Sequence, residues 1–338
     1  MPPATQMIAP GAPLPTVDLP YAPPVITAPP APLRRPKAPA FALLALGVLL
    51  VIGPIVGGLF VKTAAGEQMI DEFAPYMQNG SLARYGTDIA TLRAGAAGIH
   101  DVYRTQGITG GRYPGLDEFR TQSTAILGRA AGLLDRVRAT RPDYQRISGI
   151  GGFERIPFLI VACGAVAIYG ACVLLAGRRS RARPTVLLVV VASAALVAYP
   201  FVSGLFGGAQ SGQRMLHTLG PVMTPHEVRL LQDDFVVLVN ADGQLDTTFR
   251  SVAQPGPSAT QITAMVNGWP RISSDLASLV GVINDNIGNF DALDDLDTRT
   301  RQARLGGLGT FPWLLVGIGA LTAGLALAAA PRRGREPQ

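Results

Sequence analysis

The chain has 338 residues, of which 48 % are hydrophobic and 15 % are charged, with a mean hydropathy of +0.28 and a net charge of +6. This composition is unusually apolar for a soluble domain of this length and ordinary for a protein with several membrane spans. It therefore favours a polytopic membrane protein, and the positive charge must be located along the chain before it can indicate a partner. Only two of the 29 basic residues are lysines, a bias typical of a GC-rich, bacterial genome.

Residues 1–40 differ in kind from the rest of the chain, because thirteen of them are proline. They show no periodic apolar face and cannot bury enough surface to fold alone, so we expect a disordered cytoplasmic tail. Such a proline-rich segment acts either as a spacer or as a ligand for the aromatic groove of a partner.

The first apolar run, at 41–61, contains no charged residue and is long enough to cross a bilayer. After it, apolar residues recur at helical spacing over 82–103 and over 116–137, on either side of the breaker GITGGRYPG. Pro114 in this breaker stands where a new helix can begin. A second uncharged apolar run follows at 156–177, so this part of the chain is predicted to be a helical domain between two spans.

A short Arg-rich link at 178–184 leads to a third apolar run at 185–206. Beyond it, after a break at QPGPSAT, apolar residues recur at helical spacing over 262–283, around a Trp-Pro pair at 269–270. The fourth uncharged run is at 311–330. No segment alternates with the two-residue period of a half-buried strand, so the second part of the chain is also predicted to be helical.

Basic residues cluster in three short segments that border the spans and contain only two acids, Asp18 and Glu336. By the positive-inside rule these segments lie in the cytoplasm, which places both termini inside and makes the protein a multi-pass protein of the plasma (inner) membrane. The clusters are Arg34, Arg35 and Lys37, then Arg178, Arg179, Arg181 and Arg183, and finally Arg332, Arg333 and Arg335.

The two long segments between the spans are then outside and nearly balanced in charge. The segment 63–155 has eleven Arg against ten acids, and 207–310 has seven Arg against eleven acids. The basic excess of the chain is therefore a signal of membrane topology, and nucleic acid is excluded as its partner. Membrane lipids remain as partners, since the basic clusters are attracted to anionic headgroups.

A stretch in the first half of the chain recurs 146 residues later. PIVGGLFVKTAAGEQMIDEFAPYM begins at Pro54 and PFVSGLFGGAQSGQRMLHTLGPVM begins at Pro200, with nine identities where ordinary residue frequencies give roughly two. A further match, at an offset of 155, joins GGFERIPFLIVACGA from Gly151 to GGLGTFPWLLVGIGA from Gly306. Between these stretches, Asp88 aligns with Asp234 and Leu92 with Leu238 at the first offset, and Tyr113-Pro114 aligns with Trp269-Pro270. These matches predict a tandem duplication of one module, with an insertion of about ten residues between Leu238 and Gly268. The aligned positions are Pro54/Pro200, Val56/Val202, Gly58/Gly204, Leu59/Leu205, Phe60/Phe206, Gly66/Gly212, Met69/Met215, Pro75/Pro221 and Met77/Met223.

The predicted fold class is thus an all-α polytopic membrane protein with four transmembrane helices, two helical extracytoplasmic domains and an internal duplication. The four arms of the outer domains are expected to share one core, with a kink or break at Pro75 and Pro221. Both copies run in the same sense through the membrane, so we expect an axis of symmetry along the membrane normal. The predicted order is tail 1–40, span 41–61, outer domain 63–155, span 156–177, link 178–184, span 185–206, outer domain 207–310, span 311–330 and tail 331–338.

Two features of the spans bear on their packing. Pro54 and Pro200 lie in the outer halves of their spans and are expected to kink them alike. Each span also has two small residues four apart, a spacing that lets helices in lipid approach closely or that arises by chance in Ala- and Gly-rich runs. These pairs are Gly53/Gly57, Ala167/Ala171, Ala194/Ala198 and Ala320/Gly324.

No catalytic, cofactor-binding or metal-binding residue is predicted. Cys163 and Cys172 are nine residues apart, on opposite faces of one helix, and cannot form a disulfide. His100, His217 and His226 stand apart from any ligand-spaced cluster, so we interpret them as surface or capping residues.

The acid-rich segment DNIGNFDALDDLDTRT, which begins at Asp285, lacks the ligand spacing, the turn glycine and the closing Glu of a calcium-binding loop. We interpret it as a solvated helix end. Because the sequence also has neither a nucleophile elbow nor a phosphate-binding loop, it favours a protein that is not an enzyme.

The predicted topology resembles that of the prominin and tweety families, in which neighbouring spans enclose long helical outer loops. The resemblance covers 41–330 as architecture without a shared motif, and the chain departs from it in having four spans instead of five, smaller outer domains and no outer cysteines. It implies a membrane-organising or lipid-contacting role and assigns no functional residue.

Two main functional hypotheses follow. The first is a structural, accessory or scaffold subunit that presents its helical outer domains to protein partners in the cell envelope or to further copies of itself. The second is a component that binds or transports lipids or other hydrophobic molecules along the seam between the halves. The absence of charged residues in the spans argues against ion-coupled pumping. An extracytoplasmic sensor is a third hypothesis.

Overall fold

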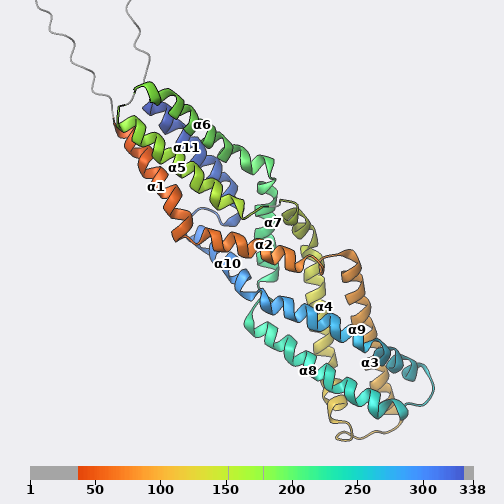
Figure 1. Ribbon diagram of the computed structural model, residues 1–338. Helices are drawn as coiled ribbons and strands as arrows, with labels where there is room; N and C mark the ends of the chain where they lie inside the picture. Colours follow the sequence, from red (N-terminus) through yellow and green to blue (C-terminus); the bar gives the residue numbers. More distant parts are fainter. Residues whose placement is uncertain (1–36, 151, 178, 331–338) are drawn as a thin grey trace, which may run out of the picture. The chain divides into compact units, whose positions relative to one another are not determined.

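The computed structural model describes residues 37–150, 152–177 and 179–330, so nearly all of the predicted tail 1–40 and the whole of 331–338 lie outside the described residues. The described part of the chain is helical and contains no strand (Figure 1). Its helices are α1 (Ala38–Val56), α2 (Leu59–Phe73), α3 (Asn79–Thr105), α4 (Pro114–Ser148), α5 (Arg155–Leu175), α6 (Arg179–Val202), α7 (Leu205–Leu219), α8 (Pro225–Thr247), the 3₁₀ helix η1 (Phe249–Ser251), α9 (Pro257–Asp285), α10 (Ile287–Gln302), the 3₁₀ helix η2 (Leu308–Thr310) and α11 (Phe311–Ala329).

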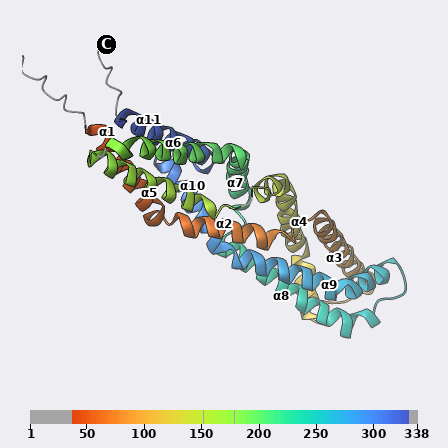
Figure 2. The ribbon, with the colours of Figure 1, turned by 45° about the horizontal axis from the view of Figure 1, so that its top comes forward.

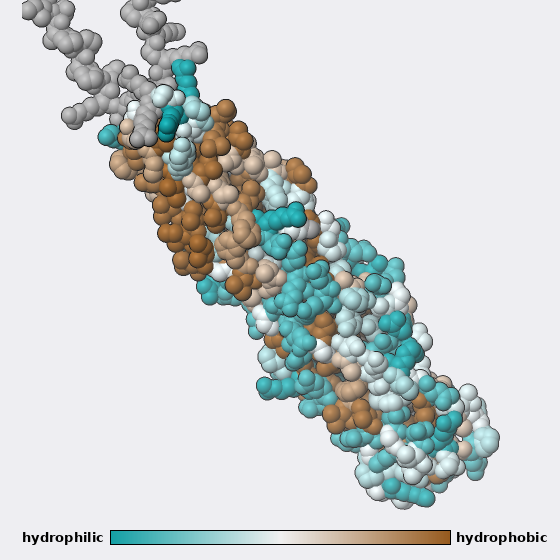
Figure 3. Space-filling view, viewed as in Figure 1, coloured by the Kyte–Doolittle hydropathy of each residue, from teal (hydrophilic) through white to brown (hydrophobic). Residues whose placement is uncertain are grey.

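Four of these helices, α1, α5, α6 and α11, are long and apolar enough to cross a membrane, which confirms the prediction of four apolar helices. They form one bundle, which we call the apolar bundle, in which α1 and α6 each contact both α5 and α11. Large apolar side chains such as Leu49, Val56 and Phe158 are more than half exposed on its surface. Figure 3 shows this surface as a continuous hydrophobic area over α1 and α5. Burial against an apolar surrounding stabilises such a surface.

The ends of two apolar helices differ from the prediction. The run 41–61 was expected to form one kinked helix, but α1 already ends at Val56, and α6 likewise ends at Val202 within the run 185–206. Each helix ends two residues after a proline, and the next helix begins just after Gly58 or Gly204, whose φ angles are +65° and +72°. The left-handed backbone of these glycines interrupts the helix, which is a stronger change than the kink expected from proline alone.

The start of α6 also differs from the prediction. Its first residues belong to the segment 178–184 that was predicted to be a link, and Pro184 lies inside the helix. In the same way, α1 begins at Ala38, three residues before the predicted span. A helix that starts in polar or basic residues before an apolar run is not visible in hydropathy, which reports only the apolar part.

The other seven α-helices have mixed surfaces and form what we call the amphipathic bundle (Figure 3). The predicted breaks are present, because α2 ends before Pro75 and α7 ends before Pro221. Both helices predicted in the segment 63–155 are present as α3 and α4, and Pro114 is the first residue of α4, as expected.

The Trp-Pro pair of the second half, at 269–270, does not stand at the start of a helix as Tyr113-Pro114 does. Pro270 was aligned with Pro114, but it lies in the middle of α9, which instead begins at Pro257. The apolar spacing over 262–283 and the break at QPGPSAT identified this helix and its start correctly. Only the equivalence of the two prolines is wrong, because Pro114 begins its helix and Pro270 lies inside one.

Helices from the first half of the sequence pack mainly against helices from the second half in the amphipathic bundle. There α3 contacts α9, α4 contacts α7 and α8, and α2 contacts α10. Figures 1 and 2 show α2 beside α10 from two directions. A hydrophobic core built from α3, α4, α8 and α9 includes the fully buried Leu116, Phe119, Leu245 and Ile262. The expected common core of four arms is thus present.

Ion pairs follow the same arrangement. Among the described residues, every Lys or Arg ion pair between residues more than four positions apart joins the two halves of the sequence. These pairs are Lys62–Asp295, Arg84–Asp275, Arg129–Asp234, Arg214–Asp143 and Arg271–Asp88.

Candidate hydrophobic binding site

Close glycine contacts hold the apolar helices in pairs. A methyl group placed on Gly164 of α5 would lie 2.9 Å from the carbonyl oxygen of Gly47 in α1. A methyl group on Gly319 of α11 would lie 2.9 Å from the carbonyl oxygen of Ser193 in α6. Only glycine therefore permits these helix approaches. The contacts are equivalent in sequence, since Gly47 and Ser193 are 146 residues apart and the other two glycines are 155 apart.

Matching aromatic pairs lie where the apolar bundle meets the amphipathic bundle. The rings of Phe60 and Phe158 are edge to face with centroids 5.1 Å apart, and those of Phe206 and Trp313 are edge to face at 4.9 Å. These pairs connect α2 to α5 and α7 to α11. The residues that recur in the sequence thus build the same contact twice at this junction.

An apolar cavity of about 100 Å³ lies directly beside these contacts, and we call it the junction cavity. It is partly open, and its walls come from α2, α7 and α10 together with the first residues of α5 and α11. Its lining includes three of the identical pairs of the repeated stretch, namely Leu59 and Leu205, Gly66 and Gly212, and Met69 and Met215.

Two glycines create space in this wall. A methyl group on Gly66 would lie 3.5 Å from Leu293, and one on Gly212 would lie 3.6 Å from Leu308, which are ordinary contact distances. Glycine is therefore not required at these positions by close packing, although it lowers helix stability by about 1 kcal/mol relative to alanine. Larger side chains at these two positions would fill the cavity.

One charged group interrupts the apolar wall. The Lys62 ammonium nitrogen, Nζ, lies 2.6 Å from Asp295 Oδ2 in α10, and only 12 % of the lysine side chain is exposed. Hydrogen bonds from Lys62 and then from Arg299 lower the pKa of the Asp295 carboxyl group. Asp295 therefore stays ionised at neutral pH, and its contact with Lys62 joins the two halves at the edge of the cavity.

A second apolar cavity, which we call the distal cavity, has a volume of about 70 Å³ and is also partly open. It lies between α3 and α4 on one side and α8 and α9 on the other. Tyr85, Ile89, Leu134, Phe235 and Leu276 are among its lining residues. Like the junction cavity, it is bordered by both halves of the sequence.

Two acids in the wall of the distal cavity occupy matching positions, 146 residues apart. Asp88 is 2 % exposed and pairs with Arg271, while Asp234 receives a hydrogen bond of 2.7 Å from Arg129 Nε. Burial raises the pKa of Asp88, and the charge of Arg271 only partly opposes this. Each carboxylate thus meets a guanidinium from the other half of the sequence.

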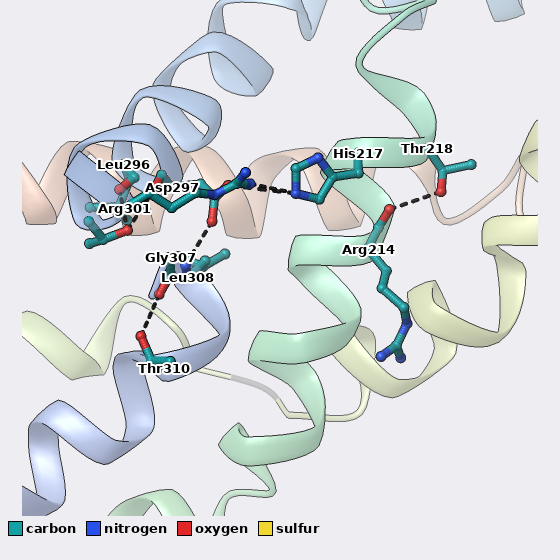
Figure 4. Close-up of polar contacts among 10 residues, drawn as sticks. Arg214, His217, Thr218, Leu296, Asp297, Arg301, Gly307, Leu308 and Thr310 are labelled. Carbon is teal, nitrogen blue, oxygen red and sulfur yellow. Dashed lines mark hydrogen bonds and ion pairs between the residues drawn. The ribbon is translucent and has the colours of Figure 1, made fainter. Parts of the chain in front are cut away.

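The acid-rich segment after Asp285 is not simply a solvated helix end, contrary to the interpretation of its sequence. Asp297 in α10 is fully buried and accepts a hydrogen bond of 2.7 Å from the backbone N–H of Leu308. It also pairs with Arg301, which contacts His217 of α7 (Figure 4). This polar cluster fixes the turn between α10 and α11, which explains why one acid of the segment is buried.

The remaining candidates from the sequence lie apart from the two cavities. Cys163 is buried and Cys172 is exposed, in agreement with opposite faces of α5. His100 contacts the carbonyl oxygen of Arg120, and His226 is exposed at the start of α8. No cluster of potential metal ligands occurs among the residues that the structure describes.

The small-residue pairs of the spans have unequal roles. Ala167 and Ala171 are fully buried, as a packing role requires. The close approaches between helices instead involve Gly164 and Gly319, which the four-residue spacing did not identify. Both glycines belong to the second repeated stretch, and that repetition was the signal that could have found them. The remaining small residues of the predicted pairs are exposed, namely Gly53, Gly57, Ala194, Ala198, Ala320 and Gly324.

Comparison with family models, with curated proteins and with solved structures finds no match to this chain.

Proposed function

We propose that this protein is a non-enzymatic integral membrane protein that binds the acyl chain of a membrane lipid, or a similar hydrophobic molecule, in the junction cavity. The observation that carries the proposal is an apolar, partly open cavity at the point where apolar helices meet amphipathic ones, lined by residues that recur in both halves. A hydrocarbon chain would gain contacts in such a cavity without leaving polar groups unpaired.

The membrane arrangement is part of the proposal. The four apolar helices would span the membrane with both termini in the cytoplasm, and the amphipathic bundle would lie outside. The junction cavity would then open near the outer headgroups, next to a supply of acyl chains. This placement rests on the Arg-rich segments and on the balanced charge of the intervening ones.

The proposal also includes an internal duplication. The matched glycine contacts of Gly164 and Gly319, the matched left-handed Gly58 and Gly204, and the matched aromatic pairs support it. A two-fold axis along the membrane normal would then place the junction cavity between equivalent helices.

The insertion in the second copy would lie later than the sequence alignment suggested. Asp88 and Asp234 occupy matching positions at an offset of 146 residues. Their arginine partners, Arg129 in the first half and Arg271 in the second, would then match as well, at an offset of only 142 residues. The extra residues would therefore follow Arg271, where α9 and α10 together take the place of the single helix α4. The misplaced Trp-Pro pair was the reason for putting the insertion before Gly268.

The cavity can be tested by filling it. The variant Gly66→Leu/Gly212→Leu should occlude it, and Gly128→Leu/Gly243→Leu is the matched control, because these helical glycines have nothing within 4 Å. Purified proteins in vesicles would be irradiated with a phospholipid that carries a diazirine near the carboxyl end of its acyl chain. We expect labelled peptides from α2 and α7 in the wild type and the control, and at least a five-fold loss in the occluded variant.

Equal labelling of all three proteins, or labelling confined to the outward faces of α1 and α5, would contradict the proposal. Circular dichroism and gel filtration of each variant show whether a loss of labelling reflects a loss of structure.

A second candidate function is that of a structural or accessory subunit with protein partners, or a homo-oligomer. The observation that favours it is a pair of exposed apolar residues on the amphipathic bundle, Val236 and Val239 of α8, which are 55 % and 43 % exposed. Extraction in mild detergent followed by mass spectrometry separates the two functions. A stoichiometric protein partner supports the accessory role, whereas enrichment of one lipid without a partner supports lipid binding.

A further inference from the structure

A block of buried side chains lies between the two cavities. One hydrophobic cluster shares Met69, Met215 and Phe290 with the junction cavity and Leu133, Leu231 and Leu279 with the distal cavity. The members of this cluster that line neither cavity include Phe73, Met77, Leu219 and Met223. We call these four residues the barrier, because in the chain they stand between α2 and α7, which line the junction cavity, and α3 and α8, which line the distal cavity.

The barrier consists of matched positions at two breaks between helices, from α2 to α3 and from α7 to α8. Phe73 and Leu219 are the last residues of α2 and α7, and Met77 and Met223 each follow a proline by two residues. All four are between 4 % and 6 % exposed. Because turns separate α2 from α3 and α7 from α8, these side chains are not held by continuous helices.

Methionine makes such a barrier deformable. Its unbranched side chain has three rotatable bonds and adapts to irregular apolar surroundings at low cost. Of the five methionines in the described residues, Met69, Met77, Met215 and Met223 all belong to this cluster. A leucine or isoleucine barrier would be stiffer.

We infer that the distal cavity is a second binding site for the same acyl chain, which reaches it by displacing the barrier. This inference rests on the proposed function of the junction cavity. Both cavities are smaller than the roughly 150 Å³ cavity that binds benzene in a protein core, so each holds only a segment of a long chain. A lipid chain that enters at the junction therefore extends toward the distal cavity.

The walls of the distal cavity fit hydrocarbon better than any polar ligand. Its lining is apolar apart from two tyrosine hydroxyl groups and the acids Asp88 and Asp234, and both carboxylates are engaged by arginines of the opposite half. A methylene chain leaves these ion pairs intact, whereas most polar groups of another ligand would face the apolar remainder of the lining without partners. The occupant is thus the terminal part of the chain, with the polar headgroup left at the membrane side.

The test compares two positions of the photoreactive group along one chain. The full-length protein would be placed in vesicles of phosphatidylethanolamine and phosphatidylglycerol, with a phospholipid that carries a diazirine either near the carboxyl end or at the terminal carbon of one chain. We expect the first probe to label α2 and α7 and the second to label α3, α4 and α9.

Two kinds of variant locate the effect. Met77→Trp/Met223→Trp enlarges the barrier, and Ala130→Leu fills part of the distal cavity without touching the barrier. Each should lower labelling of α3, α4 and α9 by at least five-fold while labelling of α2 and α7 persists. The control Val236→Trp/Val239→Trp changes exposed residues of α8 and should leave both patterns intact.

The outcomes separate this inference from the function on which it rests. Labelling of α2 and α7 without labelling of α3, α4 and α9 in the wild type overturns the second site and leaves the junction cavity as the one that binds lipid. Absence of both overturns both proposals. Distal labelling that survives the barrier variant but not Ala130→Leu supports the second site and rejects the route through the barrier.

Discussion

At the scale of single residues, Asp242 in α8 is the acid whose surroundings disfavour its charge most clearly. Its Oδ1 atom is buried without a hydrogen-bond partner. Burial first, and then the negative charge of Asp246, raise its pKa to about 6. At pH 7 the folded protein therefore holds an ionised carboxylate in a poor environment, and this lowers its stability.

The first prediction concerns the pH dependence of this effect. Because the pKa of Asp242 is higher in the folded state than in the unfolded state, protonation of this carboxyl group favours folding. This contribution to stability is complete below about pH 4 and is lost as the pH rises through about 6. Asp242→Asn should therefore raise the unfolding free energy at pH 7.5 by ~1–2 kcal/mol and change it little at pH 4. Thermal unfolding in detergent at both pH values measures this. The exposed Asp233→Asn is the control, and an equal effect of Asp242→Asn at both pH values would argue against burial as the cause.

The second prediction concerns the glycines of the apolar bundle. Valine at position 164 or 319 would collide with the backbone of the neighbouring helix, so each substitution should destabilise the protein by ~1–3 kcal/mol. Gly324→Val is the control, because nothing lies within 4 Å of that residue. Resistance to detergent-induced unfolding measures the difference, and equal behaviour of all three variants would show that these contacts do not limit helix approach.

At the scale of helices, local signals in the sequence predicted most elements, and long-range packing decided the rest. The 3.6-residue period identified α3, α4 and α9, and the prolines at 75 and 221 marked true breaks. The ends of α1 and α6 were missed because Gly58 and Gly204 lie inside apolar runs, where hydropathy gives no sign of a left-handed backbone. The alignment of Pro270 with Pro114 was wrong, because Pro114 begins α4 whereas Pro270 is tolerated in the middle of α9.

The candidate site was less predictable than the helices. The repeat singled out Leu59, Gly66 and Met69, but a sequence does not tell which apolar residues fill space and which border a void. Burial of Asp297 was also missed, because its partners Arg301 and Leu308 are arranged by the turn before α11. Both features depend on how separate helices and turns meet in the folded chain.

The third prediction concerns the ion pairs that join helices of the two halves. A double-mutant cycle on Asp88→Ala and Arg271→Ala should give a coupling energy of ~1 kcal/mol, since the carboxylate is buried although the guanidinium is half exposed. The same cycle on Asp135 and Arg138, which are exposed neighbours on α4, should give less than half of that. Equal couplings in the two cycles would mean that burial of Asp88 adds nothing.

At the scale of the whole molecule, helices of each half of the sequence pack mainly against helices of the other half, so each half is incomplete on its own. The fourth prediction is that residues 37–177 and 178–338, expressed as separate chains, co-purify when made together, because α3 needs α9 and α4 needs α7 and α8. Each half alone should be degraded or aggregate. Cooperative thermal unfolding of an isolated half would contradict this expectation.

The fifth prediction tests the proposed orientation. Alkaline phosphatase fused at Gly115 or Gly256, beside the turns between helices of the amphipathic bundle, should be active in bacteria, because that enzyme folds only outside the cytoplasm. A fusion at Arg183, within the Arg-rich segment, should be inactive. The reverse pattern would invert the topology and move the junction cavity to the inner leaflet.

The contacts between halves also set the order of events during synthesis. Arg84 and its partner Asp275 are 191 residues apart, and a ribosome that adds 5–20 residues per second needs roughly 10–40 s to make the second after the first. Throughout that interval α3 and α4 lack the contacts that they make with α7, α8 and α9. We therefore expect a pause in translation between the halves to increase aggregation or degradation of the nascent first half, because part of its apolar surface is still uncovered.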